Sequence, residues 1–117
     1  MRIAVIGGSG FVGSRLLSLL QAVSGAELRN IDKRPSELHP DVTEIADVLD
    51  VQKLTELLAG VEVVVLLAAE HRDDVTPASL YYKVNVDGMH NTLRAMESNG
   101  IYRLIFTSSV AVYGLNK

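Results

Sequence analysis

The stretch RIAVIGGSGFVG, residues 2–13, decides how this chain folds. Its first five residues are mostly apolar, which is typical of a buried parallel strand. Glycines follow at once, and apolar residues then recur at helical spacing, at Phe11, Val12, Leu16, Leu17 and Leu20. A strand, a glycine-rich turn and a helix in this order predict a turn that binds a pyrophosphate group. Free N–H groups and the positive end of the helix dipole would there face the negative charge.

The glycines of this turn have separate tasks in this interpretation. Gly7 takes the tight turn out of the strand, Gly10 lets the chain approach the phosphates, and Gly13 lets the helix lie close to the sheet. Phe11 and Val12 lie between them and complete the predicted phosphate site. A glycine triplet also occurs in ordinary loops, but such loops lack the apolar strand and helix that flank this one.

The composition limits the classes of function that the chain can have. The 117 residues are enough for one domain with a real core, and we expect a single domain over residues 1–117. The net charge is -3 and lysine and arginine form no stripe, so no nucleic-acid or membrane partner is expected. The chain has no cysteine, which excludes disulfides, thiol catalysis and cysteine-bound metal.

The first residues and the apolar runs carry no signal for export or membrane insertion. A charged second residue followed at once by a strand is not typical of a signal peptide. The longest apolar run, residues 61–69, contains Glu62 and is too short to cross a bilayer. We therefore expect a cytoplasmic protein.

The rest of the chain alternates predicted strands with predicted helices. Further strands are expected at 26–31, 43–46, 62–68 and 102–107, and helices at about 11–23, 51–59 and 77–98. The segment KRPSELHPD, residues 33–41, is predicted to be a loop. Such alternation requires right-handed crossovers and a parallel sheet, so we expect an α/β, Rossmann-like, doubly wound sheet with strand order 3-2-1-4-5.

Asp32 ends the second predicted strand, nineteen residues after Gly13. At about this spacing an acidic side chain reaches the adenosine ribose of a dinucleotide and accepts protons from both hydroxyls. Its charge would repel a 2′-phosphate, which favours NAD over NADP, although Lys33 and Arg34 could soften the discrimination. The alternative is that Asp32 only caps the turn into residues 34–38.

Two further segments follow strands at the same predicted edge. In ADVLD, residues 46–50, Asp47 and Val48 would pass beside the adenine, while Asp47 could equally cap the next helix, a role for which Asp50 is better placed. The fourth strand ends in Leu67, Ala68 and Ala69, whose small alanines would leave room for a cofactor. Ordinary packing explains these alanines almost as well.

Taken together, these motifs resemble those of the extended short-chain dehydrogenase/reductase family, which includes NAD-dependent nucleotide-sugar epimerases and dehydratases. The resemblance covers the whole chain and rests on GGSGFVG, Asp32, ADVLD, LLAA, NVDG and FTSSVAVYG, in that order. The last motif, placed directly after an apolar strand, is much more specific than the glycine turn.

The resemblance implies a role for several residues near the end of the chain. Ser109 matches the catalytic serine, which would hydrogen-bond the sugar oxygen undergoing oxidation, and Thr107 and Ser108 would line the same cleft. These hydroxyls could instead only cap the strand. Asn85 would brace the central strands from its helix, and Gly88 would allow that helix to pack closely. Tyr113 and Lys117 are not the family's Tyr-x-x-x-Lys pair, since Gly114 favours a turn and that pair needs a helix.

The histidines and the chain end complete these expectations. His71 lies among charged residues at 70–74, where a solvated loop touching cofactor or substrate is preferred over a catalytic histidine, and His39 and His90 lack metal-ligand spacing.

The sequence ends before a helical Tyr-x-x-x-Lys, so the chain alone is expected to be inactive. Its apolar fifth strand favours a homodimer or higher self-association. The alternative is a non-catalytic dinucleotide-binding or interaction module.

Overall fold

The computed structural model describes residues 1–23, 25–67 and 78–107. In these residues, strands and helices alternate as the sequence predicts, and their ends differ from the predicted ends by at most two residues. The elements are β1 (Arg2–Ile6), α1 (Phe11–Val23), β2 (Glu27–Asp32), β3 (Thr43–Ile45), α2 (Val51–Leu57), β4 (Val63–Leu67), α3 (Ala78–Ser98) and β5 (Arg103–Thr107). A short 3-10 turn at Pro40–Val42 lies in the segment that was predicted to be a loop.

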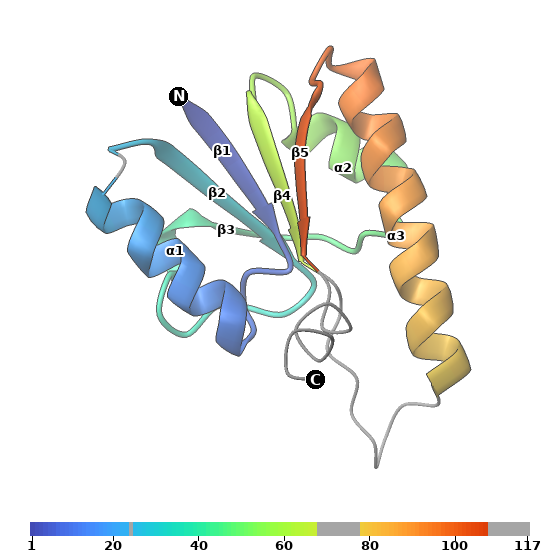
Figure 1. Cartoon of the computed structure of the whole chain (residues 1–117), viewed down its shortest axis with the longest axis horizontal. Coiled ribbons are helices and arrows are strands. Elements are labelled where there is room, and N and C mark those ends of the chain that lie inside the picture. The colour runs from blue at the N-terminus through green and yellow to red at the C-terminus, as the bar shows by residue number, and fades with distance from the viewer. Residues whose placement is uncertain (24, 68–77, 108–117) are drawn as a thin grey trace, which may run out of the picture.

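The sheet has the predicted order, β3-β2-β1-β4-β5, and every pair of neighbouring strands is parallel. β1 is the central strand: Val5 is paired with Asn30 of β2 on one side and with Val65 of β4 on the other. Figure 1 shows α1 on one face of the sheet and α2 and α3 on the opposite face. This arrangement confirms the Rossmann-like, doubly wound architecture.

The core lies on both faces of the central strands. On the α1 face, the buried cluster contains Ile3, Val5, Leu17, Val65 and Leu67. On the other face, α2 and α3 cover a larger cluster that includes Ala4, Ile6, Ile31, Leu54, Leu58, Val64, Leu66, Ala95 and Met96. Because successive residues of a strand face opposite sides, the continuous apolar runs of β1 and β4 fill both layers.

Helix α3 comes close to the segment between β3 and α2 at Gly88. A Cβ added to Gly88 would lie 3.1 Å from Cγ2 of Val48, which is tighter than an ordinary contact. The predicted reason for glycine in this helix, close packing, is therefore confirmed, although the neighbour is a loop residue. Asn85, predicted to brace the strands from the same helix, is half-buried.

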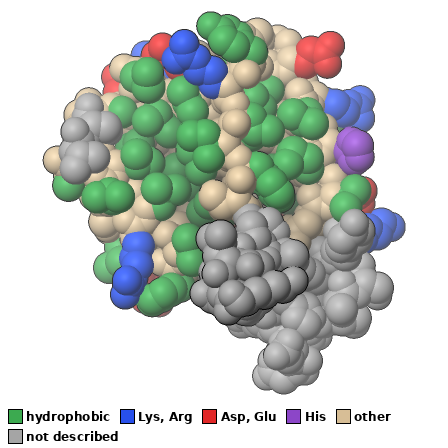
Figure 2. Space-filling view, viewed as in Figure 1, with side chains coloured by type: hydrophobic (Ala, Val, Ile, Leu, Met, Phe, Trp, Pro, Cys, Tyr) green, Lys and Arg blue, Asp and Glu red, His purple; other side chains and the backbone are tan. Residues whose placement is uncertain are grey.

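β5 is much less buried than the central strands. Only Leu104 is half-buried among its five residues, while Ile105 is 54% exposed and Phe106 is 43% exposed. Figure 2 shows hydrophobic side chains gathered over the part of the view in which Figure 1 draws β1, β4 and β5. Among the described residues, no helix has the length and apolar character needed to span a membrane.

Candidate functional site

The glycine turn runs across the carboxyl edge of the sheet between β2 and β4. Gly7 has a φ of 89° and donates its N–H to the carbonyl of Ile31 at 2.8 Å. A Cβ added to Gly7 would lie 3.1 Å from the carbonyl oxygen of Leu67, which is tighter than an ordinary contact. The predicted tight turn is confirmed. In an open sheet, this region beside the central strand is where ligands bind.

Gly13, in the first turn of α1, lies against the glycine turn itself. A Cβ at Gly13 would approach Cα of Gly8 and would lie 2.7 Å from the Gly8 carbonyl carbon and 2.9 Å from the Gly7 oxygen. The predicted close approach is correct, but its neighbour is the backbone of the turn and not the sheet. The start of α1 is thereby fixed against residues 7 and 8.

The first turn of α1 offers N–H groups that the helix cannot satisfy. The first intrahelical bond runs from the Ser14 N–H to the Gly10 carbonyl at 2.9 Å, so the amides of Phe11, Val12 and Gly13 precede the helical ladder. The side chains of Phe11 and Val12 are 67% and 60% exposed. The Arg15 guanidinium lies 4.5 Å from the centroid of the Phe11 ring. This geometry suits an anion held by backbone amides.

Asp32, at the end of β2, accepts two backbone hydrogen bonds. Its Oδ2 accepts from the Ser9 N–H at 3.0 Å, and its Oδ1 accepts from the Arg34 N–H at 3.1 Å. The second bond is the turn cap considered as the alternative role. The first ties the carboxylate to the glycine turn, and contact of Asp32 with a ribose stays a prediction.

Asn30 is a site residue that sequence reasoning missed. It is fully buried, its Oδ1 accepts from the Gly8 N–H at 2.8 Å, and its Nδ2 donates to Oγ of Ser9 and Oγ1 of Thr43, both at 3.1 Å. A signal was available, because Asn30 precedes Asp32 by two residues and therefore points to the same face of the strand.

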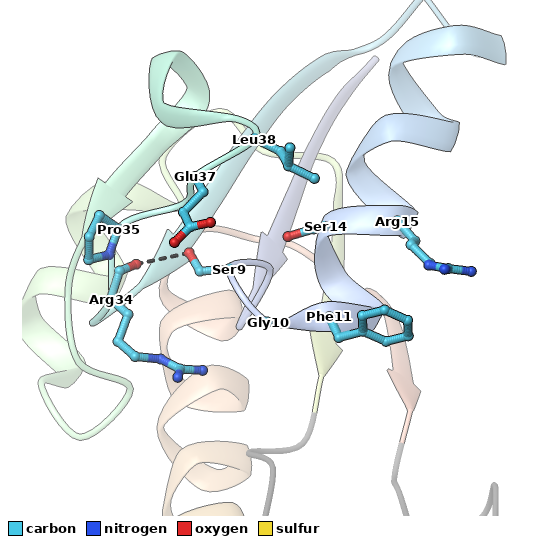
Figure 3. A pocket seen from close by; sticks show the side chains of 9 residues that line it. All are labelled: Ser9, Gly10, Phe11, Ser14, Arg15, Arg34, Pro35, Glu37 and Leu38. Carbon is cyan, nitrogen blue, oxygen red and sulfur yellow. Dashed lines mark hydrogen bonds between the residues drawn. The ribbon is translucent and has the colours of Figure 1, made fainter.

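A cleft of about 510 Å³ opens beside these residues. Figure 3 shows the glycine turn and the start of α1 on one wall and the segment after β2 on the other, with a 2.9 Å hydrogen bond from Oγ of Ser9 to the Arg34 carbonyl between them. Of the predicted cofactor residues, Gly10 and Phe11 line this cleft. Its other lining residues are Ser9, Ser14, Arg15, Arg34, Pro35, Glu37 and Leu38.

The predicted adenine-side residues lie at the next loop of the same edge. Oδ1 of Asp47 accepts from the Leu49 N–H at 2.9 Å, while Asp50 caps α2 by accepting from the Lys53 N–H at 3.1 Å. Asp50, which the sequence favoured for this role, is therefore the cap of α2, and the alternative cap role of Asp47 is wrong. The Val48 carbonyl accepts from Nδ2 of Asn91 on α3 at 3.0 Å. Contact with adenine remains a prediction for both Asp47 and Val48.

A known protein family matches almost the whole of this chain. A family model described as "NAD dependent epimerase/dehydratase family" matches residues 3–117. The chain belongs to this family. The resemblance stated from the motifs is thereby confirmed.

Among curated relatives, the N-acetyl-alpha-D-glucosaminyl-diphospho-ditrans,octacis-undecaprenol 4-epimerase of Escherichia coli is 58% identical over 115 residues, covering 98% of this chain and 34% of that protein. The UDP-glucose 4-epimerase of Halalkalibacterium halodurans is 31% identical over 121 residues, covering 97% of this chain and 36% of that protein. The chain thus spans about a third of the length of these relatives.

Solved structures of related proteins superpose well on this chain. The UDP-glucose 4-epimerase of Brucella ovis in complex with NAD gives a TM-score of 0.81 at 29% identity, covering 97% of this chain and 37% of that one. A short-chain dehydrogenase/reductase superfamily protein of Agrobacterium tumefaciens with bound NAD gives 0.80 at 31% identity, covering 100% and 35%. Both neighbours hold NAD on the fold that this epimerase/dehydratase family chain adopts.

The remaining predicted residues of this family member lie around the ends of β4 and β5. Leu67 is buried at the end of β4 and is paired in register with Thr107, which is exposed at the end of β5. Ala68, Ala69, Ser108, the predicted catalytic Ser109 and the 70–74 segment with His71 lie outside the described residues.

The described histidines form no metal site. The structure contains no group of three or more His, Cys, Asp or Glu side chains suited to a metal ion within residues 1–23, 25–67 and 78–107. His39, for which the sequence offered no partner, is buried, and its Nε2 lies 2.9 Å from Oγ of Ser18 on α1. Its role is to join the segment after β2 to this helix.

Proposed function

We propose that this chain is the NAD-binding domain of a nucleotide-sugar epimerase or dehydratase. The observation that carries the proposal is the link, at the carboxyl edge of the sheet, between the glycine turn that leads into the first-turn amides of α1 and Asp32 at the end of β2, whose Oδ2 accepts from the Ser9 N–H at 3.0 Å. The 58% identity to a 4-epimerase and the NAD-bound structural neighbours support the same function. Residues 1–117 would form this domain.

The residues present suit NAD by their shape and by their donors. Gly8 and Gly13 let the glycine turn pack against Asn30 and the start of α1, where an added Cβ would collide with neighbouring atoms. The first-turn amides of α1 would hold the pyrophosphate, and Asp32 would accept the ribose hydroxyl protons. Lys33, Asp47, Val48, Leu67 and the alanines at 68 and 69 would line the adenosine and nicotinamide path. When bound, NAD would accept a hydride from a sugar hydroxyl carbon.

In this proposal, Ser109 would hydrogen-bond the sugar oxygen, and Thr107 and Ser108 would line the cleft around it. The family assigns proton transfer to a helical Tyr-x-x-x-Lys, which matches no helix predicted in this sequence. We therefore expect the 117 residues alone to turn over no nucleotide-sugar. Interconversion of nucleotide-sugar epimers by the purified chain, free of contaminating enzyme, would contradict this expectation.

Calorimetric titration with NAD and with NADP tests the cofactor assignment. The unchanged protein should bind NAD and prefer it to NADP, since the Asp32 carboxylate repels a 2′-phosphate. In Asp32→Asn the amide keeps an oxygen for one of the two backbone amides but loses the charge, so NAD affinity should fall about tenfold. The preference for NAD over NADP should narrow as well.

Glu27→Gln is the matched control for this titration. It removes a carboxylate that is 74% exposed and paired with Arg2, at the amino edge of the sheet. Both affinities should stay unchanged in this variant. Absence of NAD binding by the unchanged protein would refute the proposed function, while an unaltered NAD/NADP ratio in Asp32→Asn would refute only the role of Asp32.

We further propose that the chain self-associates through the exposed side of β5. Ile105 and Phe106 are 54% and 43% exposed, and β5 is the last strand of the described sheet. Burying lysine in an apolar contact is costly, so Ile105→Lys should weaken association roughly tenfold or more in light scattering. Val86→Lys, at a residue 39% exposed on α3, is the control. Dissociation by Val86→Lys alone would place the contact on α3 instead.

A further inference from the structure

The side chain of Asn30 joins three segments that form the proposed NAD site. Its Oδ1 accepts from Gly8 of the glycine turn, and its Nδ2 donates to Ser9 of the same turn and to Thr43 at the start of β3. No part of this side chain is exposed. The amide therefore sits between the turn, β2 and β3 with its oxygen and nitrogen both engaged.

The roles of the two ends of this amide are fixed by its partners. A backbone N–H can only donate, so the atom facing Gly8 must be the acceptor oxygen. The two hydroxyls that face the nitrogen already donate elsewhere: Ser9 Oγ to the Arg34 carbonyl at 2.9 Å, and Thr43 Oγ1 to the His39 carbonyl at 2.7 Å. Each hydroxyl thus needs a donor partner, which Nδ2 supplies.

These bonds also connect the glycine turn to the opposite wall of the cleft. The carbonyls of Arg34 and His39 belong to the segment after β2, which supplies Arg34, Pro35, Glu37 and Leu38 to the cleft. The same segment is fixed from α1 by the contact between His39 and Ser18. One buried amide therefore sets the spacing of two walls that belong to different parts of the chain.

Gly8 and Asn30 are complementary in shape as well as in hydrogen bonding. A Cβ added to Gly8 would collide with Oδ1 of Asn30 and lie 2.9 Å from its Cγ. The amide occupies the space that a side chain at position 8 would need. The glycine turn is therefore fitted to Asn30, which lies 22 residues away in the sequence.

We infer that Asn30 is a positioning residue for the dinucleotide: it fixes the glycine turn against the 34–43 segment and so sets the affinity for NAD. The inference rests on the proposed function. Asn30 itself is buried and acts through Gly8, Ser9 and Thr43. Its contribution is to hold the α1 amides and the Asp32 carboxylate at a fixed separation before the cofactor arrives.

Asn30→Asp tests the inference in the intact protein. The carboxylate keeps an acceptor for Gly8 but has no hydrogen to donate, so Ser9 and Thr43 must turn their hydroxyls toward it and release the Arg34 and His39 carbonyls. NAD affinity by calorimetry should fall about tenfold or more, and amide exchange at residues 7–13 and 34–39 should accelerate without ligand. Thr43→Val, which removes one partner and keeps Asn30, should show a smaller change of the same kind and serves if Asn30→Asp does not fold.

Thr92→Val is the control for a buried polar side chain that has no part in the site. Thr92 is fully buried on α3, and its Oγ1 donates to the Gly88 carbonyl within the same helix at 2.7 Å. The Thr92→Val variant should leave NAD affinity and amide hydrogen exchange at residues 7–13 unchanged. Unchanged NAD affinity in a folded Asn30→Asp or Thr43→Val protein would overturn the inference.

The experiments distinguish a failure of the proposed function from a failure of this inference. If the unchanged protein does not bind NAD, the proposed function fails, and the exchange measurement decides whether Asn30 fixes the turn. Faster exchange confined to residues 7–13 and 34–39 would support that positioning. Exchange in Asn30→Asp and Thr43→Val equal to that of the unchanged protein would refute it.

Discussion

Glycine occurs at both edges of the sheet, and its surroundings differ between them. At the amino edge, Gly25, Gly60 and Gly100 precede strands with φ values of 62°, 80° and 69°. Among the described residues, no atom beyond the adjacent residues lies within 4 Å of a Cβ added to Gly25 or Gly100. At the carboxyl edge, a Cβ added to Gly8 or Gly13 would lie closer to neighbouring atoms than van der Waals contact allows. Gly25 and Gly100 serve the backbone angles, whereas Gly8 and Gly13 bring segments together. Gly7, with a φ of 89°, and Gly60, whose added Cβ would lie 2.7 Å from Nη1 of Arg2, combine both features.

This difference separates two reasons for glycine: close packing of segments at the candidate site, and reversal of the chain between a helix and the next strand. A helix that returns to a strand needs a left-handed residue, and glycine adopts that conformation at little cost. A turn that presents its backbone amides to a ligand requires residues without side chains. Substitution by alanine separates the two requirements, because its effect depends on what the new methyl group meets.

The largest effect is expected for Gly13→Ala. The methyl group would meet the backbone of Gly7 and Gly8, which cannot rotate aside as a side chain can. The free energy of unfolding should fall by about 3 kcal/mol, as in severe overpacking. NAD affinity should fall about a hundredfold because the start of α1 is displaced from the turn. Chemical denaturation and calorimetric titration measure these two quantities. Normal NAD binding by this variant would contradict the link between crowding at the carboxyl edge and the NAD site.

The fold could be predicted because local patterns agree with the tertiary arrangement. The apolar run of β1, the helical spacing of α1 and the glycines that precede β2, β4 and β5 predicted the β-strands and α-helices of the described residues to within two residues. Asp50 was identified as the cap of α2 because capping depends on residues three positions apart. These signals are short in range, so a single sequence is enough to detect them.

The site was predicted less completely because its bonds join distant residues. In the sequence, Asn30 is only a polar residue within a strand, and its partner Gly8 becomes evident only in the folded chain. The partner of His39, Ser18, lies on α1, far away in the sequence. Asp32 was predicted as a ribose ligand or a turn cap, and its bonds to Ser9 and Arg34 combine a link to the glycine turn with the cap. Such partners depend on how distant segments pack together, so the two-residue spacing of Asn30 and Asp32 indicates a shared face but not the groups that they bond.

A smaller effect is expected for Gly8→Ala, because its methyl group would meet side chains. Oδ1 and Cγ of Asn30 and Cδ1 of Leu17 are the nearest atoms, and they can shift more readily than backbone. Unfolding free energy should fall by about 2 kcal/mol. In an Asn30→Ala background, which removes the amide, the added cost of Gly8→Ala should be about 1 kcal/mol smaller. Denaturation of the four proteins of this cycle gives the coupling, and simple additivity would contradict the contact.

The smallest effect is expected for Gly25→Ala, which tests the amino edge alone. The methyl group would meet no atom within 4 Å in the part of the chain that the structure describes, so the expected cost is that of holding alanine at a φ of 62°. That cost is about 1 kcal/mol of unfolding free energy, close to the penalty for a left-handed residue other than glycine. NAD affinity should be unchanged, because Gly25 lies at the opposite end of α1 from Phe11 and Val12. A loss of NAD affinity comparable to that of Gly13→Ala would show that the two edges are coupled through α1. The edges would then not be independent, and crowding at the carboxyl edge would no longer mark the site.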